Sequence, residues 1–339
     1  MKAAILTQLN KPLSVEDVDI TKLQIGQVLV KIKKSGLCGA QLQEIMGLKG
    51  NLKFLPHMLG HEGCGVVEEI GEGVSTVKKG DKVILHWRKS YGIESVFPNY
   101  KWNKVNITGG KITTLSEYSI ISENRMTKVD QEISDDYCAL LGCGLSTGLS
   151  VINNEANIKF GESVLILGAG GVGLNCVISC NLSNAYPIVA IDINDSKKNL
   201  VKINGGTLYT IQEIDKALDF IKKIDCIVDT TGDYELVSKF IPYLSDQGRC
   251  IFVAQPKPFS SLSITNPIKF FSSNDILFKT TQAGGFNPDI DIPKYVKLFL
   301  NNKIDVHKII TDYFTLNDIN YAIDKLKAGN SGRIMINIE

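Results

Sequence analysis

A glycine-rich turn between an apolar run and a helical pattern constrains the fold of this chain more than any other feature. Residues 162–173 read ESVLILGAGGVG, and Asp192 follows 19 positions after the last glycine, at the end of the run PIVAID. VLIL has the composition of a buried parallel strand. The three spaced glycines permit a tight turn, close approach of a pyrophosphate, and close packing of the next helix on the strand. The sequence therefore predicts a βαβ unit that binds a dinucleotide at a helix N-terminus.

The same unit predicts which dinucleotide is bound and which residues contact it. A carboxylate at Asp192 would accept hydrogen bonds from a free ribose diol and repel the 2′-phosphate of NADP, and no arginine stands beside it, so we expect NAD. The lysines that follow come later, on the expected next helix. The residues predicted to bind the cofactor here are Gly168, Gly170, Gly171, Val172, Gly173, Asp192, Ile193 and Lys197.

Bulk properties are those of a soluble globular protein. The 339 residues suffice for two ordinary domains, and 44% of them are apolar and 22% charged. A formal net charge of +1 gives no electrostatic basis for binding nucleic acid or an anionic membrane. No apolar run reaches the roughly 18 residues of a membrane span, and the N-terminal residues lack the features of a signal peptide. We therefore expect a cytoplasmic protein without nucleic-acid or membrane partners.

Eight scattered cysteines, with no CxxC pair, argue against a disulfide framework. Four of them lie in helical or strand-like apolar runs of the predicted nucleotide fold, where reduced cysteine behaves as a small buried hydrophobic residue. We assign these four to the core: Cys176, Cys180, Cys226 and Cys250.

Strand and helix signals divide the chain into three stretches and place it in the α/β class. Residues 1–150 carry short β-branched runs between turns, which predicts a mostly-β domain. Residues 151–288 alternate strands with helices, which predicts a doubly wound parallel sheet of about six strands. Residues 289–339 are expected to return to the first domain. The candidate strands of the sheet are VLILG, PIVAID, TLYT, DCIVDTTG, RCIFVA and ILFKTTQ, and helical patterns in the first stretch are confined to 39–46, 135–141 and 146–153.

Three glycine-flanked segments outside the nucleotide fold carry candidate metal ligands. SGLCGAQLQEI supplies Cys38, LGHEGCGVV supplies His61 and Glu62, and LLGCGLSTG supplies Cys143. Two thiolates and one imidazole with an open fourth position are typical of catalytic zinc, whereas structural zinc sites are closed by four protein ligands. The ligands are far apart in sequence and have no local geometry, so buried structural cysteines and a core histidine remain open interpretations at this point.

Five longer motifs decide between these interpretations. They are GLCG, GHEGCGVVEEIGEGVSTVKKGDKVI, GCGLSTG, GAGGVG and VAIDIN. Through them the whole chain resembles the zinc-dependent alcohol dehydrogenases of the medium-chain dehydrogenase/reductase superfamily. The resemblance implies a GroES-like catalytic domain beside a Rossmann domain, with Cys38, His61 and Cys143 holding one catalytic zinc ion. It also implies that Glu62 lies near the metal and can join it transiently.

The resemblance implies a function and an assembly. Zinc would lower the pKa of a bound alcohol, and hydride would pass to NAD. Thr147 would lie against the nicotinamide, and Arg333 would reach the cofactor phosphates. A homodimer or homotetramer is expected, paired through strand-like segments near 275–282. Two alternatives stay open: a zinc-free NADPH-dependent reductase of the same superfamily, and a non-catalytic nucleotide-binding protein on this scaffold.

The chain departs from the family around its first ligand. Ala40 stands where a Thr or Ser hydroxyl usually passes the substrate proton outward, and Gln43 stands where a histidine often completes that relay. We hypothesise a substituted relay through water, a ribose hydroxyl, or an imidazole such as His57 or His86. Gln41 replaces an aspartate that commonly accepts the imidazole N–H of the zinc ligand, and its side-chain carbonyl could do the same as a weaker acceptor.

A second departure concerns residues 86–113, where many relatives carry four cysteines around a structural zinc. This segment has no cysteine, so a second zinc is not expected. One interpretation is a specificity loop with aromatic walls and a cationic rim, suited to a polyol, an amino alcohol, or a phosphorylated or nucleotide-linked sugar. The other is that the aromatic residues replace the packing of the lost metal lobe and the charges are solvated. The residues concerned are Trp87, Tyr91, Tyr100, Trp102, Arg88, Lys89, Lys101 and Lys104.

Overall fold

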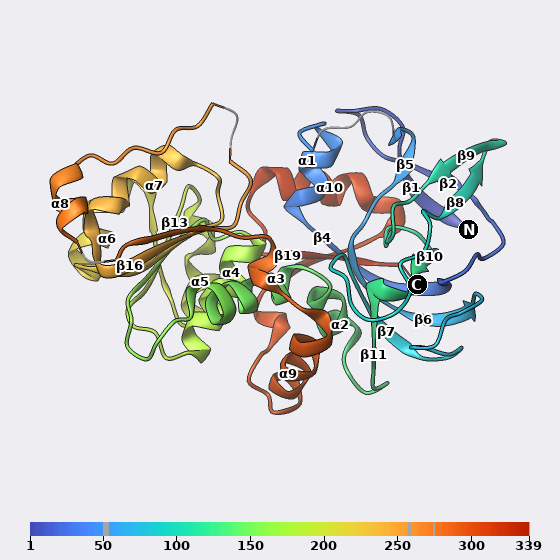
Figure 1. Cartoon of the computed structure of the whole chain (residues 1–339). Helices are drawn as coiled ribbons and strands as arrows, with labels where there is room; N and C mark the ends of the chain where they lie inside the picture. The colour runs from blue at the N-terminus through green and yellow to red at the C-terminus, as the bar shows by residue number, and fades with distance from the viewer. Residues whose placement is uncertain (50–53, 257–258, 274, 339) are drawn as a thin grey trace. The chain divides into compact units, whose positions relative to one another are not determined.

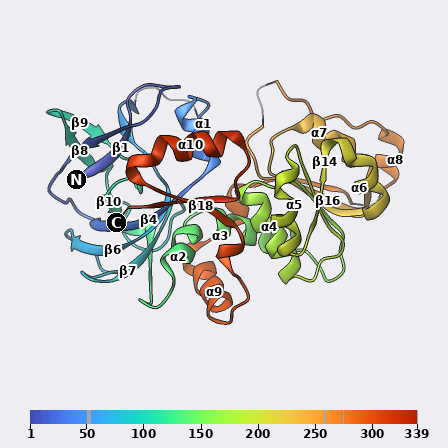
Figure 2. The ribbon, with the colours of Figure 1, turned by 180° about the vertical axis from the view of Figure 1, so that it is seen from behind.

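The chain divides into two units, and the second is inserted in the sequence of the first (Figures 1 and 2). The first unit combines Met1–Ser146 with Asn287–Glu339, and the second is the continuous stretch Thr147–Phe286. The chain passes into the second unit after residue 146, where the sequence suggests 150, and returns at 287 rather than 289. The computed structural model describes residues 1–49, 54–256, 259–273 and 275–338.

The second unit is built on a six-stranded parallel sheet in the order β14-β13-β12-β15-β16-β17. The chain starts at the centre, adds two strands on one side and then three on the other, which is the doubly wound topology of dinucleotide-binding folds. All six runs expected from the sequence form this sheet, so the predicted Rossmann fold is confirmed. The strands are β12 (Val164–Leu167), β13 (Ile188–Asp192), β14 (Thr207–Thr210), β15 (Ile224–Asp229), β16 (Leu244–Phe252) and β17 (Leu277–Thr280).

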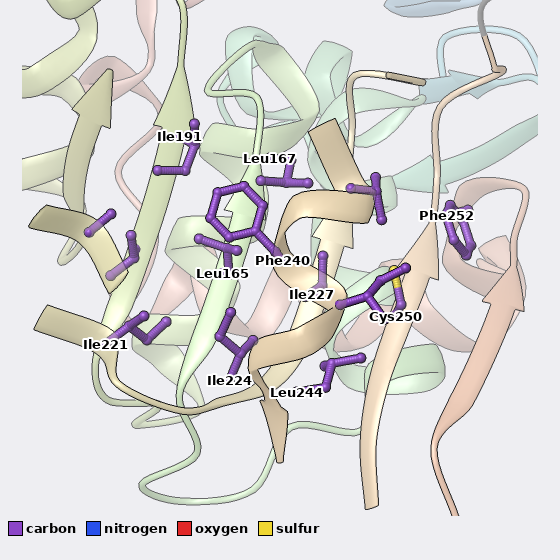
Figure 3. Close-up of a cluster of buried hydrophobic side chains, with 14 residues drawn as sticks. Leu165, Leu167, Ile191, Ile221, Ile224, Ile227, Phe240, Leu244, Cys250 and Phe252 are labelled. Carbon is purple, nitrogen blue, oxygen red and sulfur yellow. The ribbon is translucent and has the colours of Figure 1, made fainter. Parts of the chain in front are cut away.

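Alternate residues of these strands form a core with the helices on one face of the sheet (Figure 3). Leu165 and Leu167 of β12 point to the same side, because side chains alternate along a strand, and Phe240 of α7 packs on that side. Ala217 and Ile221 of α6 contribute from one helix face, being four positions apart. The helices of this unit are α4 (Gly171–Leu182), α5 (Lys198–Ile203), α6 (Ile214–Ile221), α7 (Tyr234–Phe240) and α8 (Pro267–Ser272).

The first unit contains two mostly antiparallel sheets, as the sequence predicts for a mostly-β domain. One has the order β2-β1-β5-β9-β8-β3, and the other has the order β11-β7-β6-β4-β19-β18 with β10 also paired to β4. The first sheet consists of β1 (Lys2–Leu6), β2 (Ser14–Asp17), β3 (Asp19–Ile20), β5 (His57–Met58), β8 (Asn99–Trp102) and β9 (Val105–Thr108). The second consists of β4 (Gln27–Leu37), β6 (Glu62–Ile70), β7 (Lys82–His86), β10 (Tyr118–Ser122), β11 (Met126–Val129), β18 (Ile310–Thr315) and β19 (Arg333–Asn337).

Strand β4 organises the second of these sheets. It pairs antiparallel with β6 and β10, and its C-terminal half also pairs with β19 from the last part of the chain. The last part of the chain therefore adds a strand to this sheet of the first unit. Because β4 ends at Leu37 and β6 begins at Glu62, these pairings bring two of the three candidate metal segments to one edge of the sheet.

Helices fill the ends of this unit. The expected helix at 135–141 is present as α2, with Ser134 capping its N-terminus through a hydrogen bond from the backbone N–H of Tyr137. None of the helices in the described part of the chain has the length and apolar character that crossing a bilayer requires. The helices are α1 (Gly39–Ile45), α2 (Asp135–Leu141), α3 (Gly144–Ser150), which continues beyond the unit boundary, α9 (Pro288–Leu300) and α10 (Ile319–Ala328).

All eight cysteines are free and buried. The four that the sequence assigns to the core of the second unit, Cys176, Cys180, Cys226 and Cys250, have no exposed surface. Burial raises the pKa of Cys226 to about 12, which keeps a buried thiol neutral and unreactive.

Candidate active site

Cys38 lies where β4 ends and α1 begins. It is the N-cap residue of α1, with extended backbone angles, and its backbone N–H donates a hydrogen bond of 2.7 Å to Oε1 of Gln41. This bond satisfies a polar group at the helix end and ties Cys38 to the first turn of α1. The first turn of the helix therefore fixes where the first candidate ligand lies.

Glycines bring the other two ligand segments together. Gly60 has a φ of +102°, a conformation that side chains disfavour, so the turn that precedes His61 favours glycine. A Cβ atom at Gly142 would lie 2.7 Å from the Cα of Glu62. The segment that carries Cys143 can therefore pack directly on the segment that carries His61 only because residue 142 has no side chain.

The structure brings Cys38, His61 and Cys143 together as predicted. One sulfur from each cysteine and one ring nitrogen of the histidine lie within 4.8 Å of one another. Zinc binds sulfur at about 2.3 Å and nitrogen at about 2.0 Å, so donors around one ion lie within roughly 4.6 Å of each other. The three side chains thus fit a single zinc ion and leave its fourth position to a small ligand.

The two thiols are already inequivalent. The hydrogen bond from Cys143 holds the pKa of Cys38 well below its usual value, with desolvation opposing and His61 assisting. The same bond, together with burial, raises the pKa of Cys143 well above its usual value. Metal binding would displace the protons that remain on these thiols, because zinc binds the thiolate form.

Glu62 lies behind this cluster rather than in it. Its Oε2 accepts a hydrogen bond of 2.8 Å from the backbone N–H of Gly144, and its Oε1 is paired with the guanidinium of Arg333. The candidate ligand group does not include it, so the prediction of Glu62 as a metal ligand is not supported. Burial raises the pKa of Glu62, while Arg333 acts in the opposite direction.

Arg333 is the buried counter-ion of Glu62, with 2% of its surface exposed. The guanidinium also lies within 2.9 Å of where a Cβ atom of Gly144 would be, so a larger residue at 144 would displace it. In this structure Arg333 therefore supports the segments that carry the ligands. Its expected contact with cofactor phosphates stays a prediction.

Two expected supporting residues have other roles. Gln41 uses its carbonyl oxygen for the backbone of Cys38, and its buried side-chain nitrogen has no hydrogen-bond partner among the described residues, so Gln41 is not placed as the acceptor for His61. His86 hydrogen bonds through one nitrogen to the carbonyl of Arg88 and through the other to Thr127. His86 is fully buried and is not among the residues that line the cavity described below, and burial lowers its pKa to about 4, so the hypothesis that His86 relays a proton is not supported.

A cavity of about 600 Å³ opens beside the cysteine–histidine cluster, within the first unit. His61 and Cys143 line it, and so does Ala40, the position where a relay hydroxyl is missing. Gln43 is not among its lining residues. Much of the remaining wall is apolar and includes Leu9, Phe54, Leu55, Leu59, Trp87 and Phe97.

The segment 86–113 contributes to this cavity in part. Trp87 lines it, as expected, whereas Tyr100 is fully buried in a core cluster and Trp102 packs against the same cluster. The cationic rim is not supported for the four cations named for it, because none of them lines this cavity: Arg88, Lys89, Lys101 and Lys104.

The cations that do line the cavity were not singled out from the sequence. Lys111 and Arg125 are both paired with Glu94 at 3.1 Å, so their charges are largely balanced within the wall, and Lys49 adds a third. Glu44 also lines the cavity. Its spacing of four from Ala40 on a predicted helix was a usable signal, because such residues share a helix face.

In the second unit, the glycine loop has the conformation that the motif predicts. Gly168 has a φ of +90°. A Cβ atom at Gly173 would collide with the carbonyl oxygen of Gly168, whereas one at Gly170 would meet no atom within 4 Å. Gly170 is the N-cap of α4, so open space lies where the helix presents its free N–H groups. Gly171 and Val172 open the same helix, and Thr147 is a buried residue of α3.

Asp192 ends β13, as predicted, and is held by several donors. Its oxygens accept hydrogen bonds from the backbone N–H of Ala169 at 2.7 Å and that of Asn194 at 2.9 Å. Nζ of Lys197 lies 3.2 Å from the carboxylate, and both side chains are less than 10% exposed. Ile193, by contrast, is 78% exposed.

The fold and this site together define a two-domain dehydrogenase of the zinc-binding, medium-chain type. Residues 24–131 match the family model of the alcohol dehydrogenase GroES-like domain. The protein named alcohol dehydrogenase 6 of Peromyscus maniculatus is 31% identical over 99% of this chain and 97% of its own length. The chain therefore belongs to the zinc-type alcohol dehydrogenases of the medium-chain dehydrogenase/reductase superfamily.

Solved structures show the same fold over the full length. A zinc-binding-domain alcohol dehydrogenase protein from Burkholderia ambifaria superposes with a TM-score of 0.89 at 23% identity, covering 100% of this chain and 98% of that one. The alcohol dehydrogenase of Aeropyrum pernix superposes with a TM-score of 0.79 at 26% identity, covering 100% of both chains.

Proposed function

We propose that this alcohol dehydrogenase uses one zinc ion and NAD to interconvert an alcohol and its carbonyl compound. The observation that carries the proposal is the cluster of Cys38, His61 and Cys143, of which His61 and Cys143 line a cavity large enough for a small substrate. A zinc-free reductase would not need two cysteines and a histidine arranged as metal ligands. A non-catalytic protein would not need these ligands beside a cavity that a substrate can enter.

The residues of the chain divide the chemical work. When bound, zinc supplies Lewis-acid activation of the alcohol oxygen, and NAD supplies the hydride acceptor. Cys38, His61 and Cys143 would hold the metal, and the Glu62–Arg333 pair keeps two of their segments in place. The largely apolar cavity wall displaces water from the reacting oxygen, which strengthens electrostatic interactions there.

NAD is the proposed cofactor because Asp192 stands at the position that meets the adenosine ribose in this fold. A 2′-phosphate would lie against a carboxylate whose neighbouring cation, Lys197, is already paired with it. The free hydroxyls of NAD would instead find an acceptor that is fixed in place by two backbone N–H groups.

The cavity suggests which part of an alcohol is recognised. Leu9, Leu55, Trp87 and Phe97 present apolar and aromatic surface, and two of the lining cations are already paired with Glu94. We therefore propose a primary or secondary alcohol with an apolar or aromatic body in place of the polyols and sugar phosphates that a cationic rim would suit.

Metal analysis and a substrate panel test the proposal. We expect about one zinc per chain in the purified protein, and NAD reduction with aromatic and medium-chain alcohols that exceeds the rate with polyols. Cys143→Ala should abolish both the bound zinc and turnover, whereas Cys176→Ala, which removes a cysteine from the core of the other unit, should retain both. A wild-type protein without metal that still reduces substrates with NADPH would contradict the proposal.

A further inference from the structure

The cavity wall contains an imidazole–carboxylate pair that the metal cluster does not use. Nε2 of His57 lies 3.0 Å from Oε1 of Glu44. Both residues line the cavity that His61 and Cys143 line. The His57 side chain is 14% exposed and that of Glu44 is 33% exposed. Glu44 is therefore the member of the pair that is more open to solvent.

Two separate elements hold this pair. Glu44 lies on α1, on the same helix face as Ala40. His57 begins β5, where it pairs with Leu6 of β1 and Thr108 of β9. Both elements are fixed by the packing of the first unit, so the pair is preorganised at the cavity.

The carboxylate determines which nitrogen of His57 is basic. A neutral imidazole carries one N–H and one lone pair. With Glu44 at Nε2, the N–H is held on Nε2 and the lone pair is left on Nδ1. Nδ1 is enclosed and has no hydrogen-bond partner within the described residues. This arrangement is that of a general base oriented and stabilised from behind by a carboxylate.

Glu44 is suited to stabilise an imidazolium. Burial alone would raise its pKa, but the hydrogen bond with His57 and the nearby positive charges, including Lys49, lower the pKa of Glu44 below its ordinary value. The carboxylate is therefore ionised at neutral pH and offers a negative charge to a protonated His57.

Among the lining residues that the structure describes, His57 and Glu44 are the ionisable ones that are neither cations nor members of the metal cluster. The remaining titratable groups among the described lining residues are either cations or members of the metal cluster: Lys49, Lys111, Arg125, His61 and Cys143. Ala40, which also lines the cavity, has no hydroxyl to offer.

We propose that His57 accepts the proton that the alcohol loses and that Glu44 positions His57 and passes the proton outward; the proposal rests on the proposed alcohol oxidation. The O–H bond of the alcohol breaks and an N–H bond forms at Nδ1 of His57, once a movement of the cavity wall opens this enclosed nitrogen to the alcohol or to one bridging water. The Nε2 proton moves to Oε1 of Glu44 and then to solvent. NAD, when bound, would accept the electron pair of the carbinol C–H bond as hydride, so that the alcohol is oxidised as its proton leaves through His57 and Glu44.

Variants of the pair test this relay in the zinc-loaded enzyme. His57→Ala should lower kcat at neutral pH about 100-fold, at the lower end of the range for a general base, and remove one ionisation from the pH profile of kcat. Added imidazole should restore part of the turnover in proportion to its free-base concentration. Glu44→Gln should lower kcat less and shift the same ionisation, and it replaces the first variant if His57→Ala does not fold. The matched control is His307→Ala, because His307 is exposed and does not line the cavity.

Two binding measurements separate this relay from the proposed function. The absorption bands of the cobalt-substituted protein and the fluorescence of bound NADH should be unchanged in His57→Ala. A wild-type protein that reduces no NAD with any alcohol would remove the proposed function and the relay together. An active wild type whose pH profile survives in His57→Ala, or imidazole activation that is equal in His307→Ala, would overturn the relay alone.

Discussion

At the scale of single residues, buried charges in this protein occur as pairs with distinct roles. Arg333 stabilises Glu62 behind the metal cluster, and Lys197 pairs with Asp192 beside the expected ribose site. Removing one member of a buried pair leaves the other without its counter-ion, which is costly. We therefore expect that, when one member of a pair is substituted, the remaining charged side chain becomes available to bind another group of opposite charge.

Asp192→Ser applies this reasoning to cofactor choice. The variant should lose about 10- to 100-fold in kcat/KM for NAD, since hydrogen bonds to a charged group contribute roughly 1.5–3 kcal/mol. It should gain activity with NADP, because the unpaired Lys197 can contact the 2′-phosphate. Steady-state kinetics with both cofactors measure the change. Asp195→Ser, at an exposed position three residues further on, is the control and should alter neither value.

At the scale of elements, the segment from Trp87 to Phe97 is held by ion pairs in place of a metal lobe. Glu94 lies 3.0 Å from Lys89 and 3.1 Å from both Lys111 and Arg125, and it accepts a hydrogen bond from Asn124. Burial alone would raise its pKa, but these partners lower the pKa of Glu94 to about 2. One carboxylate thus connects four residues from three stretches of the first unit.

Glu94→Gln should destabilise the first unit in a pH-dependent way. Because the folded-state pKa is depressed, the stabilisation is present above the unfolded pKa of about 4.3 and is lost as pH falls toward 2. We expect a loss of about 1–2 kcal/mol at pH 7, given that partly exposed ion pairs contribute up to roughly 1 kcal/mol each, and almost none near pH 2. Denaturant unfolding over this pH range measures it.

The control for this prediction removes a carboxylate charge that has no set of partners like the one around Glu94. Asp324 is 75% exposed and lies 3.5 Å from a single lysine of the same helix, α10. Asp324→Asn should leave the unfolding midpoint nearly unchanged at every pH. Equal losses in the two variants would show that Glu94 does not organise the segment.

The elements that the sequence predicted correctly can each be recognised from a short run of consecutive residues. This holds for the six parallel strands, the glycine turn and the helix at 135–141. The cluster of Cys38, His61 and Cys143 is not, and only the family motifs indicated it. The Glu44–His57 pairing and the Glu94 ion pairs depend on which strands become neighbours, which no local pattern records. The same limit explains why the sequence could not place the side chains of His86, Gln41 and the cations of segment 86–113.

At the scale of the whole molecule, the parallel sheet of the second unit ends at a strand edge. Within the described residues β17 pairs only with β16, and its residues are mostly exposed, Leu277 by 47%. Unpaired edges of this kind recruit further strands unless they are protected. We expect a second copy of the chain to pair there, in agreement with the family assemblies that the resemblance implies.

Leu277→Lys tests this assembly. The wild-type protein should run at twice the 37.2 kDa of the chain, or at a larger multiple, in light scattering. The variant should dissociate at lower protein concentration, because two like charges would face each other across the paired edge. Leu300→Lys, which adds the same charge at a position of 55% exposure on α9, should keep the wild-type mass.

The ion pair between Glu62 and Arg333 joins residues 271 positions apart. Translation proceeds at about 5–20 residues per second, so on the order of half a minute passes between the synthesis of the two partners. During that interval the whole nucleotide-binding unit is made. The carboxylate of Glu62, which is fully buried in the folded protein, therefore stays hydrated until Arg333 has been synthesised. We expect the nucleotide-binding unit to fold before the segments around the metal cluster are completed.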